Sequence, residues 1–107
     1  MDSPDTLSRL EATIAARAGA DPDASYVARL NARGTGKIAQ KVGEEAVETV
    51  IAALSGGKAD LVGEAADLLF HLLVLLGNKG VALSEVMTEL DRREGVSGIA
   101  EKAARKP

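Results

Sequence analysis

Two long helix-forming segments follow each other in the sequence, separated only by the short link SGG. The first runs from about residue 35 to 54 and the second from about 58 to 76, where the stretch GNKG ends it. Apolar residues recur at helical spacing along both segments, and clustered glycines are strong helix stops. So short a link makes consecutive helices antiparallel neighbours. The sequence therefore predicts an antiparallel hairpin of two long helices at the centre of the fold.

Three shorter helices are predicted around this hairpin. The first begins with Ser3 as the N-cap and Pro4 at the first helical position, and it ends at Gly19. The second begins near Pro22, ends before Gly34 and carries an apolar stripe of Tyr26, Val27 and Leu30. The third runs from Ser84, its cap, to about residue 93. No alternating strand pattern competes with these helices. We expect an all-α helical bundle of four to five helices.

Length and composition fit one small globular domain, residues 1–107, with a polar tail from about residue 94 that we expect to be partly flexible. The formal net charge of −3 argues against a nucleic-acid partner. Cysteine is absent, which excludes disulfides and thiolate metal sites. The start MDSPDTLSRL does not resemble a signal peptide, and the apolar run 68–76 is too short to span a bilayer. These features predict a cytoplasmic protein with no membrane partner.

Acidic side chains gather on one side of each long helix. Glu44, Glu45 and Glu48 share a sector of the first, although like charges so spaced weaken a helix. Glu64 and Asp67 share a sector of the second, which is otherwise apolar nearly all round and therefore predicted to be buried. A buried carboxylate must be protonated, paired or bound to a metal. Four or five carboxylates facing each other across the hairpin would form a hard-oxygen site suited to Mg²⁺ or Mn²⁺. The alternative is a solvated acidic face.

The pattern Glu45-x-x-Glu48, then Glu64-x-x-Asp67, resembles the E-x-x-E…E-x-x-D motif of the all-α, MazG-like nucleotide pyrophosphohydrolases. Three longer stretches are similar to the phosphoribosyl-ATP pyrophosphohydrolase family within that superfamily. They are SYVARLNARGTGKIAQKVGEEAVETVIAAL, EAADLLFHLLVLL and GVSGIAEKAARKP. The resemblance covers the chain from about residue 7 to 106.

The resemblance implies hydrolysis of phosphoribosyl-ATP to phosphoribosyl-AMP and pyrophosphate, the second step of histidine biosynthesis. It also implies that Glu45, Glu48, Glu64 and Asp67 bind Mg²⁺, with Mn²⁺ as a substitute. Glu44 is a candidate for a further ligand or for the base that orients the water. With Glu45 and Glu48 it completes the predicted catalytic acids.

Five side chains are candidates for binding the substrate. Lys37 and Lys41 precede the acidic cluster on the same helix face, although Lys41 could equally pair with Glu45. Asn78 and Lys79 follow the second long helix, although Asn before Gly is also an ordinary helix stop. Lys102 in the tail could close over a substrate, as could Arg92 and Arg93, although surface charge accounts for any one of these.

His71 lies four residues after Asp67 in a leucine-rich run, and such a histidine is more typical of a hydrogen-bonded core residue than of a ligand or base. Three other functions compete with this interpretation. A di-iron carboxylate bundle would need Glu-x-x-His on two helices, which one histidine cannot supply. A general nucleoside-triphosphate pyrophosphohydrolase and a non-enzymatic helical dimerisation module stay open.

The second long helix also predicts self-association. One hairpin cannot cover both sides of the run 68–76, so we expect a homodimer. Dimerisation is compatible with catalysis.

Overall fold

The computed structural model describes residues 5–95 and 98–105, and these form six helices and no strand. The all-α prediction is thus confirmed, with one helix more than expected. The helices are α1 (Thr6–Arg17), α2 (Tyr26–Arg33), α3 (Thr35–Ser55), α4 (Lys58–Asn78), α5 (Leu83–Arg93) and α6 (Gly98–Ala104).

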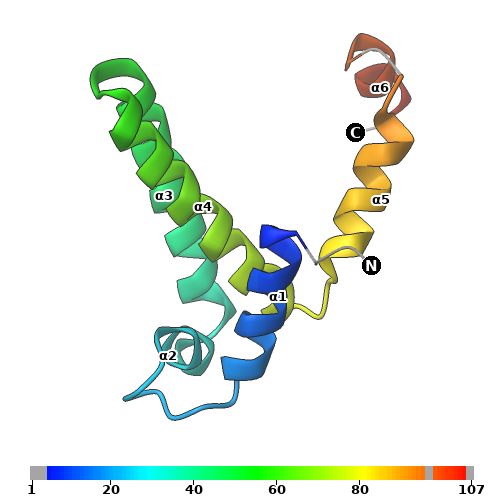
Figure 1. The fold of residues 1–107 in the computed structure, drawn as a ribbon. Helices are drawn as coiled ribbons and strands as arrows, with labels where there is room; N and C mark the ends of the chain where they lie inside the picture. The colour runs from blue at the N-terminus through cyan, green and yellow to red at the C-terminus, as the bar shows by residue number, and fades with distance from the viewer. Residues whose placement is uncertain (1–4, 96–97, 106–107) are drawn as a thin grey trace.

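The long helices α3 and α4 form the predicted antiparallel hairpin, which stands out at one side of the molecule in Figure 1. The turn between them needs glycine at position 56. A Cβ atom placed there would lie 3.0 Å from both the carbonyl oxygen of Ala52 and Oδ2 of Asp60. The backbone N–H of Gly57 donates to the same Asp60 oxygen at 3.0 Å, so Asp60 satisfies one of the free donors at the start of α4.

The hydrophobic core lies at the open end of the hairpin, where α1 packs on α4 and α2 packs on α3. Gly34 has a φ of 94°, and this left-handed conformation lets the chain pass from α2 into α3 without a loop. The buried apolar side chains that form this core are Ile14, Val27, Leu30, Ile38, Leu73, Val74 and Leu83.

Three short helices begin at other residues than the sequence predicted. Asp5 caps α1 by accepting a hydrogen bond from the N–H of Ser8 at 2.8 Å; Ser3 and Pro4 lie outside the described residues. Ser25, not Pro22, marks the start of α2, because its hydroxyl accepts from the N–H of Ala28 at 3.2 Å. In each case a side-chain acceptor, not the proline, fixes the first turn.

The start of α5 also differs from the prediction, by two residues, since the N-cap is Ala82 and not Ser84. The Glu85 carboxylate accepts from the N–H of Ala82 at 2.9 Å, so the helix begins at Leu83 and not at the expected cap Ser84. The same Leu83 side chain is buried in the core.

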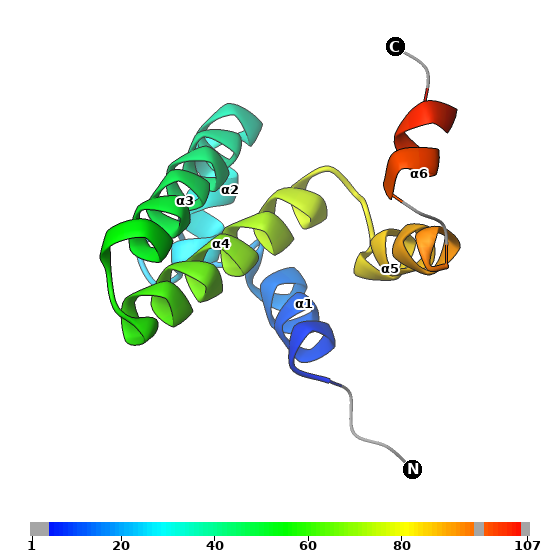
Figure 2. The ribbon, with the colours of Figure 1, turned by 90° about the horizontal axis from the view of Figure 1, so that it is seen from above.

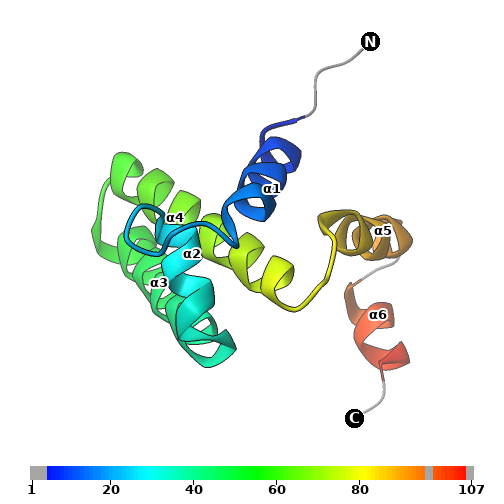
Figure 3. The same cartoon turned by 90° about the horizontal axis from the view of Figure 1, so that it is seen from below.

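Helices α5 and α6 lie apart from the hairpin, beyond the end of α4, in all three views (Figures 1–3). The tail expected to be partly flexible contains the sixth helix, α6. Its flexibility stays a prediction.

The tip of the hairpin exposes apolar side chains. In α4 the prediction of burial holds for the second half, where Leu73 and Val74 lie in the core, and it is wrong for the first half. Val62 is 61% exposed there, and Leu54 at the end of α3 is 82% exposed. The reason is that α1 and α2 cover only the open end of the hairpin. Among the described helices, none is long and apolar enough to cross a membrane.

Candidate metal centre

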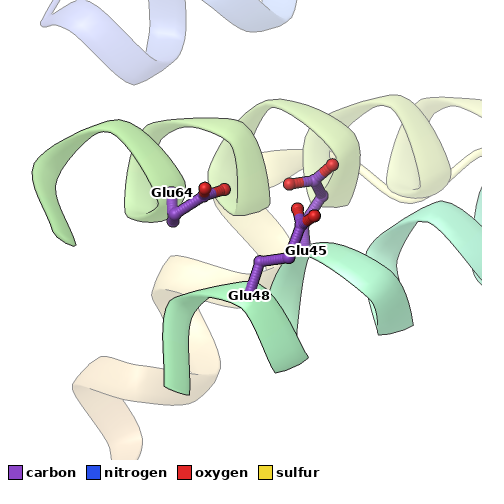
Figure 4. Close-up of side chains that lie close together, drawn as sticks. All are labelled: Glu45, Glu48 and Glu64. Atoms are coloured by element: carbon purple, nitrogen blue, oxygen red, sulfur yellow. The ribbon is translucent and has the colours of Figure 1, made fainter. Parts of the chain in front are cut away.

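Three glutamates from the facing helices of the hairpin meet at one point. Glu45 and Glu48 lie one turn apart on α3, and Glu64 lies opposite on α4 (Figure 4). One carboxylate oxygen from each lies within 4.8 Å of the other two. Glu45 is buried, Glu64 is half-buried and Glu48 is exposed. The antiparallel pairing of α3 and α4 therefore brings acids from both helices together, and we call these three residues the acidic cluster.

One oxygen of this cluster is buried without a partner. Glu45 is only 7% exposed, and its Oε2 atom has no hydrogen-bond partner in the protein. A buried carboxylate oxygen without a partner costs free energy, which a bound cation would recover. All three groups are carboxylates, the donor type that Mg²⁺ and Mn²⁺ prefer. The residues present therefore fit a hard divalent cation.

The cluster favours protonation of its own acids when no cation is bound. Burial raises the pKa of Glu45, a hydrogen bond between the carboxyl groups of Glu45 and Glu48 raises it further, and the charges of Glu48 and Asp67 add to this, while His71 acts in the opposite direction. Burial also raises the pKa of Glu64, and the charges of Glu48 and Asp67 add to the effect. Mutually repelling acids in a partly buried site are typical of cation and catalytic sites.

Asp67 lies beside the acidic cluster but not among the three converging oxygens. Its side chain is exposed, while its charge still raises the pKa of Glu45 and Glu64. Its role as a ligand stays a prediction.

Glu44 points into a different environment from Glu45. Its exposed carboxylate accepts a hydrogen bond from Nε2 of Gln40 at 2.7 Å and lies 3.4 Å from Nζ of Lys41. The hydrogen bond from Gln40, followed by that from Lys41, lowers the pKa of Glu44. A carboxylate so held is a weak base, and the proposed role of Glu44 in orienting water stays a prediction.

Lys41 lies at the edge of the acidic cluster. Its Nζ is 3.9 Å from Oε1 of Glu45, so the predicted alternative of an ion pair with Glu45 is present. Burial alone would lower the pKa of Lys41, but the hydrogen bond to Glu44 and the negative charges of Glu44 and Glu45 outweigh burial and raise it. Lys41 is therefore a firmly held cation next to the three carboxylates. Lys37 lies one turn earlier on α3, half-buried.

Asn78 connects three helices. Its Oδ1 accepts from the Thr35 hydroxyl at 2.6 Å, and its Nδ2 donates to Oδ1 of Asn31 at 3.0 Å. Both ends of the Asn78 amide are thus engaged within the protein, at the junction of α2, α3 and α4. Lys79 follows it and is exposed.

The remaining candidate cations lie far from the cluster along the chain. Arg92 and Arg93 of α5 both contact the Glu89 carboxylate, at 2.8 and 2.9 Å, and lower the pKa of Glu89 to about 2. Lys102 is exposed on α6. Figures 1–3 show both helices away from the hairpin, so this conformation does not bring Lys102 to the acidic cluster.

His71 is a hydrogen-bonded core residue, as predicted. It is 5% exposed, with Nδ1 lying 2.7 Å from the backbone oxygen of Asp67 and Nε2 lying 2.8 Å from the Tyr26 hydroxyl. The partner on α4 is thus the backbone of Asp67 and not its side chain. Tyr26, expected only to pack, is the polar contact that sequence reasoning missed. No local signal could have found it, because the two residues belong to different helices.

A groove of about 390 Å³ adjoins the acidic cluster and runs toward the turn of the hairpin. Its lining consists of Glu48, Ile51, Ala52, Ser55, Gly56, Asp60 and Glu64. A larger hollow of about 520 Å³ lies between α1 and the end of α4. Its polar side chains are already engaged, because Asn31 and Asn78 bind each other and Glu11 accepts from the N–H of Leu83, so the smaller groove is the better candidate for a charged ligand.

Fold and site together define a helical protein with a cluster of three carboxylates that could hold a cation. A family model described as phosphoribosyl-ATP pyrophosphohydrolase matches residues 7–94 of the chain. The protein named phosphoribosyl-ATP pyrophosphatase from Erythrobacter litoralis is 71% identical, over 94% of this chain and 96% of the relative. The protein of the same name from Novosphingobium aromaticivorans is 67% identical, over 98% of each chain. The chain belongs to the phosphoribosyl-ATP pyrophosphohydrolase family.

Proposed function

We propose that this protein hydrolyses phosphoribosyl-ATP to phosphoribosyl-AMP and pyrophosphate, the second step of L-histidine biosynthesis, in the cytoplasm. Family membership over most of the chain supports the reaction. The observation that carries the proposal is the buried, unpartnered Oε2 of Glu45 beside the carboxylates of Glu48 and Glu64. Such an arrangement of carboxylates could bind the divalent cation that the reaction needs.

Glu45, Glu48 and Glu64 would hold Mg²⁺, or Mn²⁺ in its place, with Asp67 as the fourth ligand. A cation bound there would neutralise charge on the triphosphate and lower the pKa of a bound water. The protein's own contribution is to position the reacting groups and to supply fixed charge, which is most of what transfer at phosphorus requires. Glu45 and Glu48, with Glu44, are the proposed catalytic acids. For Glu44 the proposed role is either that of a further ligand or that of the base that orients the attacking water.

Positive groups would bind the phosphates of the substrate. Lys41 lies beside the acidic cluster and Lys37 lies one turn before it on α3, where both can reach phosphate oxygens. Lys79 and Asn78 are proposed contacts at the end of α4, although the Asn78 amide must give up a present hydrogen bond to act directly. For Lys102 the proposal requires α6 to move toward the hairpin.

We propose that the protein is a homodimer in which a second copy covers the tip of the hairpin. The exposed apolar side chains there form a patch that a single chain leaves in water. They are Val47, Val50, Ile51, Leu54, Leu61, Val62 and Leu69. A non-enzymatic dimerisation module would account for this patch but not for the buried acid of the cluster.

A general nucleoside-triphosphate pyrophosphohydrolase is the second candidate, since the same acids would serve any triphosphate. A di-iron site is disfavoured, because both ring nitrogens of His71 are engaged with Tyr26 and the Asp67 backbone.

Substrate comparison tests the proposal and its nearest rival. Pyrophosphate release is measured with Mg²⁺ on phosphoribosyl-ATP, ATP and dCTP in parallel. We expect release from phosphoribosyl-ATP alone. Comparable release from all three would establish the general hydrolase instead, and release from none in folded protein would contradict both.

A further inference from the structure

A further groove, of about 490 Å³, lies between α1 and α2 at the open end of the hairpin (Figure 1). Its volume falls within the roughly 300–1,000 Å³ of small-molecule sites. The chain has one tyrosine and one phenylalanine, and the rings of Tyr26 and Phe70 both line this groove. The polar side chains of Thr13, Arg17 and Ser25 line it as well. The groove therefore combines aromatic surface with hydrogen-bond donors.

Among the described residues, Arg17 is the one charged side chain that lines the groove. Its exposed guanidinium has no carboxylate partner and no hydrogen bond within the part of the chain that the structure describes. Asp21 and Asp23 follow it in the loop but do not line the groove, and Oδ1 of Asp21 accepts from the N–H of Asp23 at 3.0 Å. A guanidinium without a partner favours an anion, and its fork of donors matches the oxygens of a phosphate.

Ser25 adds a second donor on the α2 side of the groove. Its hydroxyl oxygen accepts from the N–H of Ala28 at 3.2 Å, so its proton is free to donate to a ligand. Helix α2 begins at the next residue, and the positive end of its dipole therefore lies at this wall. Both sides of the groove thus offer positive or donating groups.

The groove lies close to the acidic cluster along α4. Phe70 follows Asp67 by one turn and Glu64 by six residues, so the rise along the helix from Glu64 to the groove is about 9 Å. Phosphoribosyl-ATP carries its triphosphate and its additional ribose phosphate on two different sides of one adenosine. A single molecule of this shape can place its triphosphate at the acidic cluster and its additional phosphate in the groove.

We propose that this groove binds the phosphoribosyl group by which phosphoribosyl-ATP differs from ATP, and that Arg17 is the specificity-determining residue that pairs with the phosphate of that group. The inference rests on the proposed function in taking phosphoribosyl-ATP as the substrate. Lys37 and Lys41 are the proposed contacts of the triphosphate, so a further phosphate needs a cation of its own. Arg17 supplies this cation, and the rings of Tyr26 and Phe70 provide apolar surface for the sugar.

The binding of two nucleotides that carry no triphosphate tests the proposal without catalysis. Phosphoribosyl-AMP has the additional group and AMP lacks it. Isothermal titration calorimetry with Mg²⁺ present measures both affinities in the wild type and in Arg17→Gln. The wild type should bind phosphoribosyl-AMP more tightly than AMP. Arg17→Gln should weaken phosphoribosyl-AMP about tenfold or more, the effect of losing a charge-assisted hydrogen bond, and should leave AMP unchanged.

Comparing two ligands in two proteins isolates the contact of Arg17 with the additional group. Arg17 also lies in the last turn of α1, where its charge favours the helix dipole. A purely structural role would weaken both nucleotides alike. An equal loss for both, an unchanged affinity for phosphoribosyl-AMP in Arg17→Gln, or a wild type that does not prefer phosphoribosyl-AMP would each overturn the proposal.

Two further variants refine the comparison. Arg33→Gln removes another exposed arginine, in the last turn of α2, and should bind both nucleotides as the wild type does. Arg17→Lys keeps the charge without the fork of donors and should recover part of the lost affinity.

The inference and the proposed function can fail separately. Protein that binds phosphoribosyl-AMP in an Arg17-dependent way yet releases no pyrophosphate from phosphoribosyl-ATP would contradict only the proposed function. Pyrophosphate release from phosphoribosyl-ATP with the same KM in Arg17→Gln as in the wild type would contradict only the role of Arg17.

Discussion

Lys41 lies 3.9 Å from one oxygen of Glu45, while the other oxygen of that carboxylate is buried without a partner. The two oxygens thus face different environments, one cationic and one buried without a hydrogen-bond partner. If Lys41 also contacts a phosphate oxygen, Lys41→Gln should raise KM for phosphoribosyl-ATP about tenfold, the effect of losing one charge-assisted hydrogen bond. Affinity for Mn²⁺ alone should not fall, because a competing positive charge has been removed. Steady-state kinetics and Mn²⁺ titration check both parts; a normal KM would show that Lys41 serves Glu44 and Glu45 only.

Asn78→Ala should destabilise the fold, because Asn78 joins Thr35 of α3 to Asn31 of α2 through two side-chain hydrogen bonds. Losing both should lower the free energy of unfolding by about 1–3 kcal/mol. Urea denaturation measures this, with Lys79→Ala as the control that removes an exposed neighbour and should leave stability unchanged. A variant as stable as the wild type would show that these two hydrogen bonds do not stabilise the fold.

Cation-free protein should lose stability through Glu64 as pH rises. Burial, Glu48 and Asp67 raise the pKa of Glu64, so the folded state holds this proton at pH values where the unfolded chain has released it. The unfolded state then binds fewer protons, and the stability contribution falls as pH rises from the ordinary value of a glutamate through the raised one. Urea denaturation across this range, compared with Glu64→Gln, isolates the effect.

At pH values below this range, the free energy of unfolding of the wild type should approach that of Glu64→Gln. At pH values above the range, the wild type should be the less stable of the two proteins. Adding Mg²⁺ should reverse the loss in the wild type only. Both proteins share the pH dependence that Glu45 contributes, because its pKa is also raised. An identical pH dependence in the two proteins would therefore show that Glu64 contributes nothing to it.

Leu54→Glu should disrupt the proposed dimer, since Leu54 is 82% exposed at the tip of the hairpin and a charge there cannot be buried without cost. Sedimentation equilibrium should give the mass of two chains for the wild type and of one for the variant. Ile99→Glu is the matched control, because Ile99 is 85% exposed but lies on α6. A wild-type protein with the mass of one chain would refute the dimer outright.

The hairpin could be predicted from the sequence because its signals are local. Glycines at Gly56 and Gly77 interrupt strong apolar periodicity, and the helices end within two residues of the expected places. Helix starts were less predictable, since several polar residues compete for each cap. The structure selects Asp5 and Ser25 where the prolines had suggested earlier starts.

The acidic cluster was predictable for the same reason, and its surroundings were not. Helical phase places Glu45 and Glu64 on facing sides of the hairpin, whichever way the rest of the chain folds. The contact of Tyr26 with His71 depends on how α2 crosses the hairpin, and no periodicity carries that information. The exposure of the hairpin tip was likewise missed, because an apolar pattern does not show how far α1 and α2 extend over it.

The central claim is that the acidic cluster binds the cation needed to release pyrophosphate. Its most direct test measures Mn²⁺ binding and Mg²⁺-dependent pyrophosphate release from phosphoribosyl-ATP in Glu48→Gln. Glu94→Gln serves as the control, because Glu94 is an exposed glutamate at the end of α5. Glu48→Gln should fold normally and bind Mn²⁺ more weakly, and its rate of pyrophosphate release should fall by a factor of about a hundred or more. The control variant should behave as the wild type. Wild-type rates in Glu48→Gln would contradict the account.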